Sequence, residues 1–143
     1  MTRLFFNSGN YPKNINLVLF LLRVGAGIFM LSHGWGKLLK LIGDDPITFA
    51  DPLGVGDATS LFLTVFAEVF CSILLILGLT TRLAAFPSFI TMMVAAFVVH
   101  ADDGFGKMEL ALLYGVVYLA ITIAGPGKFS IDHLVSQRIN SKK

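Results

Sequence analysis

Four long apolar stretches, joined by shorter polar connections, constrain the fold of this chain more than any other feature. They run from about Ile15 to Leu39, Ser60 to Leu79, Leu83 to His100, and Met108 to Ala124. Each is close to the roughly 20 residues that a helix needs to cross a hydrocarbon core about 30 Å thick. Backbone polar groups in lipid must be paired within the protein, so the stretches are predicted to be helices. They do not alternate apolar and polar residues, which excludes a transmembrane β-barrel.

Composition supports the same class. The 143 residues suit one domain, and 55% of them are hydrophobic whereas only 14% are charged. A soluble domain carries roughly 25% charged residues. We therefore predict an all-α integral membrane four-helix bundle as a single domain over residues 1–143. After the fourth stretch, the segment Ser130 to Asn140 has apolar residues at helical spacing, which predicts a short amphipathic helix at the membrane surface.

Basic residues predict the orientation of the bundle. Four crossings place both termini and the second connection on one side, and that side holds Arg3, Lys13, Arg82, Lys128, Arg138, Lys142 and Lys143. The opposite side holds Lys37, Lys40 and Lys107. The positive-inside rule then predicts cytoplasmic N- and C-termini. The opposite side also carries the long connection Gly43 to Ser60, whose apolar residues are expected to fold back onto the mouth of the bundle.

Two charged residues, Arg23 and Glu68, lie deep inside the predicted spans, where an ionisable group is costly and indicates function by default. Arg23 lies roughly 12 Å and Glu68 roughly 16 Å from the terminal side, counted at 1.5 Å per residue. These similar depths predict an Arg23–Glu68 ion pair between the first two helices. Two interpretations are open: a static tie that sets helix register, or a polar site for a quinone head group, a proton or a substrate.

One face of the first helix carries Arg23, Gly27, Met30, Gly34 and Lys37. They fall within about 40° of one line when residues are spaced by 100°. The glycines are typical of close helix packing. A groove along which a flat ring could lie is the alternative.

A second polar cluster is expected near the outer interface. It comprises His33, Lys37, His100 and Glu109, with Asp102 and Asp103 in the turn between the last two helices. A Lys37–Glu109 salt bridge is one interpretation. Histidine also serves as a proton carrier, a quinone hydrogen-bond partner, a metal ligand or an axial haem ligand. A quinone remains the candidate cofactor, and we predict no haem, metal or nucleotide.

The sequence has no motif for disulfide exchange, nucleotide binding or nucleic-acid binding. Cys71 stands alone in an apolar stretch, which excludes thiol–disulfide exchange within the chain and is typical of a packing residue. The chain has no Walker loop, no dinucleotide glycine fingerprint, and no basic patch suited to nucleic acid.

Three motifs, in this order, resemble those of the DoxX family of membrane proteins. They are Leu22–Phe29 with His33–Leu38, Ala67-Glu68 with Leu77–Ala85, and Gly125–Asp132. The resemblance covers about Ile15 to Leu134, and the positions that match are Arg23, Gly27, His33, Gly34, Lys37, Glu68 and Arg82. One departure is Val69-Phe70-Cys71-Ser72, where many members have paired small residues. Phe70 would narrow a groove there if it faced inward.

The resemblance implies a bacterial inner (plasma) membrane protein. Some family members are membrane subunits of thiosulfate:quinone oxidoreductases, and others are membrane partners of redox-defence enzymes. The first hypothesis is therefore a membrane subunit that holds a quinone near Arg23, His33, Lys37 and Glu68, with Glu68 or His33 as the candidate catalytic proton carrier. The alternative is a non-catalytic scaffold or assembly factor. The expected partners are the lipid bilayer, a soluble or membrane redox protein, and a second copy of the chain.

Overall fold

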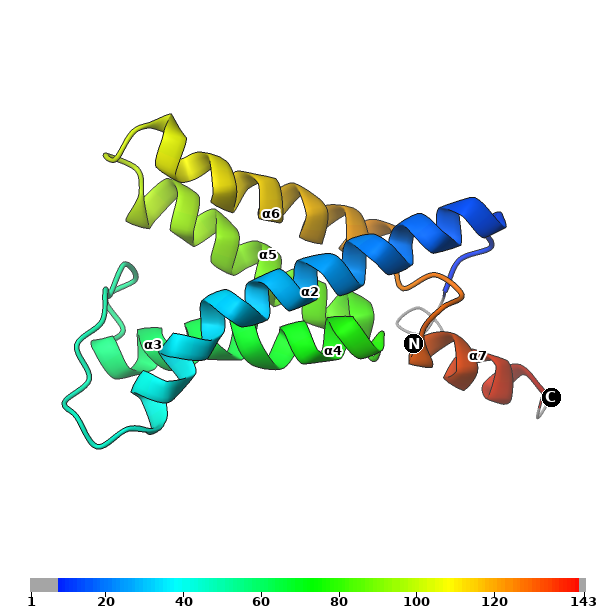
Figure 1. Cartoon of the computed structure of the whole chain (residues 1–143), viewed down its shortest axis with the longest axis horizontal. Helices are drawn as coiled ribbons and strands as arrows, with labels where there is room; N and C mark the ends of the chain where they lie inside the picture. Colours follow the sequence, from blue (N-terminus) through cyan, green and yellow to red (C-terminus); the bar gives the residue numbers. More distant parts are fainter. Residues whose placement is uncertain (1–7, 142–143) are drawn as a thin grey trace.

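The computed structural model describes residues 8–141, and five helical segments account for most of them (Figure 1). The first crossing is α2 (Lys13–Ile42). The second is one continuous helix in three parts: the α-helix α3 (Asp57–Val65), the π-helical turn η1 (Phe66–Phe70) and the α-helix α4 (Cys71–Leu77). The third comprises α5 (Thr81–Val94) and η2 (Ala95–Val99), the fourth is α6 (Phe105–Ala124), and α7 (Ile131–Ser141) follows.

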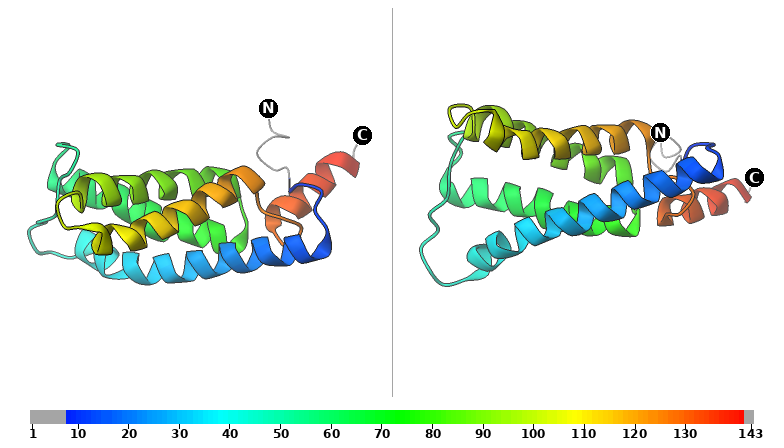
Figure 2. Two further views of the ribbon diagram at one scale, coloured as in Figure 1. Left: turned by 90° about the horizontal axis from the view of Figure 1, so that it is seen from above. Right: turned by 45° about the horizontal axis from the view of Figure 1, so that its top comes forward.

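Four helices are long and apolar enough to cross a membrane, which confirms the predicted spans with small shifts of their ends. They cover Lys13–Ile42, Asp57–Leu77, Thr81–Val99 and Phe105–Ala124. Large apolar side chains such as Phe29, Val116 and Ile123 face outward, as lipid contact requires. The start of α2 and the helix α7 lie at one end of the bundle, here called the terminal end. The long connection and the α5–α6 turn lie at the other, the loop end (Figure 2).

Of the two interpretations of the glycine face on the first helix, close packing holds at Gly27 and Gly34, and the partner is the second crossing. A Cβ atom on Gly27 would lie 2.7 Å from Cγ1 of Ile76, and one on Gly34 would lie 2.7 Å from Cγ2 of Val69. The second crossing therefore occupies the space beside both glycines. Gly25 and Gly36 have no such neighbour within 4 Å and face away from the bundle.

Arg23 is held by backbone carbonyls at the terminal end. It is 1% exposed, and its guanidinium donates to the carbonyl of Leu75, to that of Ile76 at 2.9 Å and to that of Phe129 at 2.6 Å. The predicted Arg23–Glu68 ion pair is therefore wrong.

The error came from counting depth from the ends of the two helices. Helix α2 extends well past the end of α4 (Figure 1), so Arg23 lies level with the last residues of the second crossing. Gly34, eleven residues further along α2, is the residue that packs against Glu68. Eleven helical residues span about 16 Å, which is too far for a direct contact.

Two polar residues, Asp132 and Arg82, join the helices at the terminal end. The carboxylate of Asp132 is fully buried and accepts hydrogen bonds from the backbone N–H groups of Thr80 at 2.7 Å and Thr81 at 2.9 Å. It thereby caps the N-terminus of α5, where a negative charge is favourable. Arg82 donates to the last three carbonyls of α6, those of Thr122, Ile123 and Ala124. The predicted C-terminal helix is present as α7, with Leu134 58% exposed.

The long connection folds back onto the loop end, as predicted. Ile47 and Phe49 pack against a buried cluster from α3 and η1, formed by Leu61, Val65 and Val69. Asp51 accepts hydrogen bonds from the backbone of Val55 and Gly56 and from the hydroxyl of Ser60, which ties the connection to α3. The side of the membrane on which this end lies stays a prediction, and Arg3, Lys142 and Lys143 lie outside the described residues.

Alanine substitutions at two glycines of α2 test this packing. In a helix, glycine to alanine stabilises by roughly 0.5–1 kcal/mol when the site has room. We expect Gly25→Ala to raise the melting temperature of the detergent-solubilised protein and Gly27→Ala to lower it, because only the second Cβ meets a neighbour. Equal shifts for both variants would contradict the close approach at Gly27.

Substitution of Asp132 tests the cap on α5. Asp132→Asn replaces one accepting oxygen by a donor that faces a backbone N–H, so we expect a loss of about 1–3 kcal/mol in the free energy of unfolding. Thermal unfolding in detergent measures it, with Asp102→Asn in the exposed α5–α6 turn as the control. An unchanged melting temperature for Asp132→Asn would show that the cap is not needed.

Candidate binding site

A charged pair lies at the centre of the candidate site. Nζ of Lys37 on α2 donates to Oε1 of Glu68 on η1 at 2.5 Å. The side chain of Glu68 is 6% exposed and that of Lys37 is 33% exposed. The predicted Lys37–Glu109 salt bridge is wrong, because Lys37 pairs with Glu68 while Glu109 is exposed. The close contact of Gly34 with the second crossing explains the pairing, since Lys37 lies one turn after Gly34.

Glu68 lies in a π-helical turn, a feature that sequence reasoning missed. The backbone N–H of Cys71 bonds to the carbonyl of Phe66, five residues earlier. The Ser88 hydroxyl on α5 lies 3.1 Å from the carbonyl of Ala67 and 3.1 Å from that of Ala84 on its own helix, so its single proton is shared between the widened turn and α5. Single π turns inside α-helices are frequent at functional sites. No local residue pattern in the sequence predicts the π turn at Glu68.

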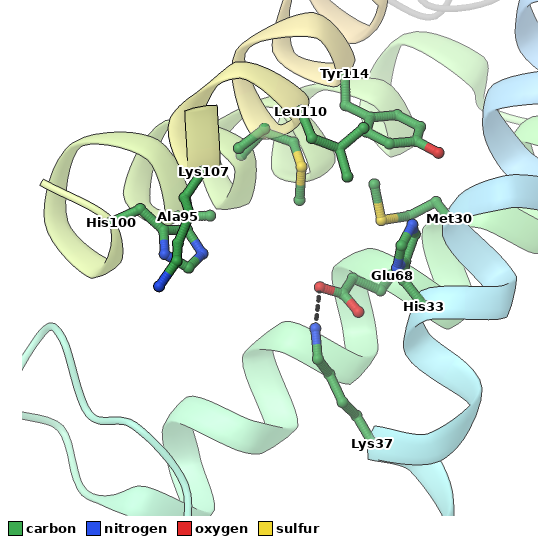
Figure 3. Close-up of a pocket in the computed structure, with 11 residues that line it drawn as sticks. Met30, His33, Lys37, Glu68, Ala95, His100, Lys107, Leu110 and Tyr114 are labelled. Atoms are coloured by element: carbon green, nitrogen blue, oxygen red, sulfur yellow. Dashed lines mark hydrogen bonds and ion pairs between the residues drawn. The ribbon is translucent and has the colours of Figure 1, made fainter. Parts of the chain in front are cut away.

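A small polar pocket of about 140 Å³ adjoins the pair (Figure 3). Its walls come from α2, η1, α5, η2 and α6, and they include Met30, His33, Lys37, Glu68, His100, Lys107 and Tyr114. Four predicted site residues, His33, Lys37, Glu68 and His100, therefore meet at one place. The other predicted residues do not: Arg23 and Gly27 lie toward the terminal end, and Glu109 is outside the pocket.

Aromatic side chains form one wall of the pocket. The ring of His33 meets that of Tyr114 edge to face at 6.1 Å, and Tyr114 stacks on Tyr118 at 6.1 Å. Tyr118 is fully buried, with its hydroxyl 3.4 Å from the carbonyl of Ala26. Sequence reasoning passed over both tyrosines. The available signal was two phenols, four residues apart on one side of the fourth apolar stretch.

Polar groups surround the pocket at the loop end. Nδ1 of His100 hydrogen-bonds Oδ2 of Asp103 at 2.8 Å, and Nζ of Lys107 lies 3.5 Å from Oδ1 of the same carboxylate. The bond from His100 is the main cause that lowers the pKa of Asp103. The pocket therefore has titratable groups between its interior and the aqueous phase at this end.

A larger apolar groove of about 580 Å³ adjoins the polar pocket. It lies between the second and third crossings, with Phe66 on one wall, Phe86 and Ile90 on the other, and Leu53 of the long connection beside them. These four side chains are partly exposed on the lipid-facing surface. The groove and the pocket share four residues, Lys37, Glu68, Ala95 and His100, so the apolar space ends on the charged pair.

Phe70 faces outward and Cys71 faces the core. Phe70 is 52% exposed and stacks on Phe66 at 5.4 Å, so it does not face inward. Cys71 is 1% exposed and belongs to the hydrophobic core, as a packing residue should. Within residues 8–141, no group of three His, Cys, Asp or Glu residues is placed to hold a metal ion.

Comparison with known proteins identifies relatives along most of the chain. A protein of Haemophilus influenzae described as uncharacterized is 36% identical over 133 residues, which is 87% of this chain and 95% of that protein. An uncharacterized membrane protein of Mycobacterium tuberculosis is 30% identical, covering 82% of this chain and 80% of its own. The inner membrane protein YqjF of Escherichia coli is 25% identical, over 81% of this chain and 90% of its own. No solved structure gives a significant match.

The family model described as DoxX matches residues 18–101. This range includes the first three crossings almost completely, and with them His33, Lys37, Glu68 and His100 of the pocket. The four apolar crossings, the matched family model and the relatives agree, and the chain belongs to the DoxX family of membrane proteins.

Proposed function

We propose that this protein is a membrane subunit of an oxidoreductase system and that it holds a quinone between its second and third crossings. The observation that carries the proposal is that the apolar groove ends on the Lys37–Glu68 pair. A quinone has a flat ring with carbonyl oxygens and, in membranes, a long apolar tail. The ring would lie at the polar pocket and the tail in the groove.

The dimensions and chemistry suit such a ligand. Ligand sites usually measure about 300–1,000 Å³, and the groove has about 580 Å³. Lys37 keeps donor capacity beyond its bond to Glu68, and His33 offers a ring nitrogen at the same pocket. His33 and Glu68 are the groups that would carry protons, because both can change protonation state when the ligand changes charge.

The cellular setting belongs to the same proposal. One relative is described as an inner membrane protein, and the excess of basic residues on the terminal side supports cytoplasmic termini in a bacterial inner membrane. The pocket would then open toward the outer aqueous phase through His100 and Asp103. No motif for a soluble redox cofactor occurs in the chain, so a partner protein would exchange electrons with the quinone.

A non-catalytic scaffold is the second candidate, and one observation favours it. The two most deeply buried charges, Asp132 and Arg23, are held by the backbone. Among the described residues, the Asp132 carboxylate accepts from two backbone N–H groups and the Arg23 guanidinium donates to three backbone carbonyls. Those contacts stabilise the terminal end of the bundle without offering a ligand site. The scaffold leaves unexplained why a second charged pair adjoins an apolar groove.

Removal of the Lys37 charge tests the head-group site. We expect Lys37→Met to weaken binding of a tailed quinone at least about tenfold, because a hydrogen bond from a charged donor contributes about 1.5–3 kcal/mol. Equilibrium dialysis of the purified protein measures it, with Glu109→Gln as the control outside the pocket. A folded wild-type protein that neither co-purifies with quinone nor binds it would leave the scaffold as the function.

Narrowing of the groove tests where the tail lies. Thr91 lines the groove, so Thr91→Trp should weaken binding of a tailed quinone and leave a tail-less quinone unaffected. Phe97→Trp is the matched control, since Phe97 is 57% exposed on the same crossing and does not line the groove. The measurement is the ratio of the dissociation constant of the tailed quinone to that of the tail-less quinone, for each variant. Equal effects of the two variants would place the tail elsewhere.

A further inference from the structure

The Glu68 carboxylate has unused capacity to accept hydrogen bonds. Lys37 donates to Oε1, whereas Oε2 is covered from solvent and has no hydrogen-bond partner among the described residues. The residue as a whole is 4% exposed, and it lines the pocket (Figure 3) and also the groove. An ionised carboxylate offers about four acceptor positions, so a single donor leaves it under-satisfied. A buried acceptor in that state favours any ligand that brings a donor.

Lys37 provides the complementary group beside it. An ammonium has three N–H donors, of which one is directed at Glu68. Its side chain is one-third exposed and lines both cavities, so the other donors remain available at the same place. The site thus presents a charged donor and a charged acceptor side by side.

The net charge of the pair limits the class of head group. An anionic head, such as a fatty-acid carboxylate, would meet the Glu68 charge, and a cationic head would meet that of Lys37. A neutral group that both donates and accepts satisfies the two residues at once. A hydroxyl has this property, whereas a carbonyl oxygen only accepts.

We propose that the site selects a hydroxyl-bearing ring with an apolar tail, and so binds the reduced quinol in preference to the oxidised quinone. The proposal rests on the proposed function and deepens it. The quinol hydroxyl accepts from Lys37 and donates to Glu68. The quinone carbonyl accepts from Lys37 and leaves the Glu68 carboxylate without a new partner. Sites that hydrogen-bond a hydroxyl reject analogues lacking it, because the buried polar group then stays unpaired.

The test compares three ligands of the same ring and tail on the purified full chain in nanodiscs, under anaerobic conditions. They are the hydroquinone, the quinone, and the dimethyl ether of the hydroquinone, which has no hydroxyl donor. Equilibrium dialysis gives the dissociation constants. We expect the hydroquinone to bind at least tenfold more tightly than either of the others, as one added hydrogen bond to a charged acceptor implies.

A variant isolates the role of the carboxylate. Glu68→Gln keeps the shape but supplies an N–H donor, which a quinone carbonyl can accept, so the preference for the hydroquinone should vanish or reverse. Glu109→Gln, outside both cavities, should keep it. If Glu68→Gln does not fold, the dimethyl ether still tests the wild-type protein.

The outcomes separate this inference from the proposed function. Equal affinity for hydroquinone and quinone would overturn the selectivity and leave quinone binding intact. A dimethyl ether that binds as tightly as the hydroquinone would assign all binding to the apolar groove and overturn the inference in the same way. Absence of binding by all three ligands to the folded protein would overturn the inference and the proposed function together.

Discussion

The close contact of α2 with the second crossing determines where Arg23, Lys37 and Glu68 lie relative to their partners. Without a Cβ, Gly27 and Gly34 let the two backbones approach, and helix association in lipid depends on such packing rather than on a hydrophobic driving force. Once the two helices are in register, Arg23 must lie beside the end of α4 and Lys37 must lie beside Glu68. A single packing interaction therefore fixes both the structural and the candidate functional charges.

The two charged centres are satisfied to different degrees, and the difference is informative. Arg23 donates to three backbone carbonyls and stacks near Phe20, at 5.7 Å from the ring centroid. Its buried Nε has no partner among the described residues, but the three bonds from the other two nitrogens join α2 to α4 and to the segment before α7, and they stabilise one arrangement of the helices. Glu68 has one side-chain partner among the described residues, Lys37, and its second carboxylate oxygen is buried without one, in a residue that lines both cavities. Polar groups buried in lipid without a full set of partners are costly, so the second centre is where a ligand would offset that cost.

The sequence predicts the bundle well because its strongest signal, the length and apolarity of four stretches, is local. It also predicts that His33, Lys37, Glu68 and His100 are candidate site residues, since polar residues are rare in such stretches. Partner choice is not local. Depth counted from helix ends paired Arg23 with Glu68, but α2 extends past α4, and this offset depends on glycine contacts that only the folded bundle reveals. The π turn at Glu68 also could not be predicted from the sequence, because it depends on contacts between helices.

That π turn relates the charged pair to the groove. A π turn widens the helix locally by one residue, and here it includes both Ala67 and Glu68, which line the groove. On α5, the Ser88 hydroxyl lies within hydrogen-bond distance of the Ala67 carbonyl. Pro87, the residue before it, also lines the groove and cannot donate a backbone hydrogen bond. Irregular backbone is tolerated at membrane depth where protein contacts satisfy it. The irregularities on the two facing helices thus coincide at the groove, and Ser88 contacts the turn that carries Glu68.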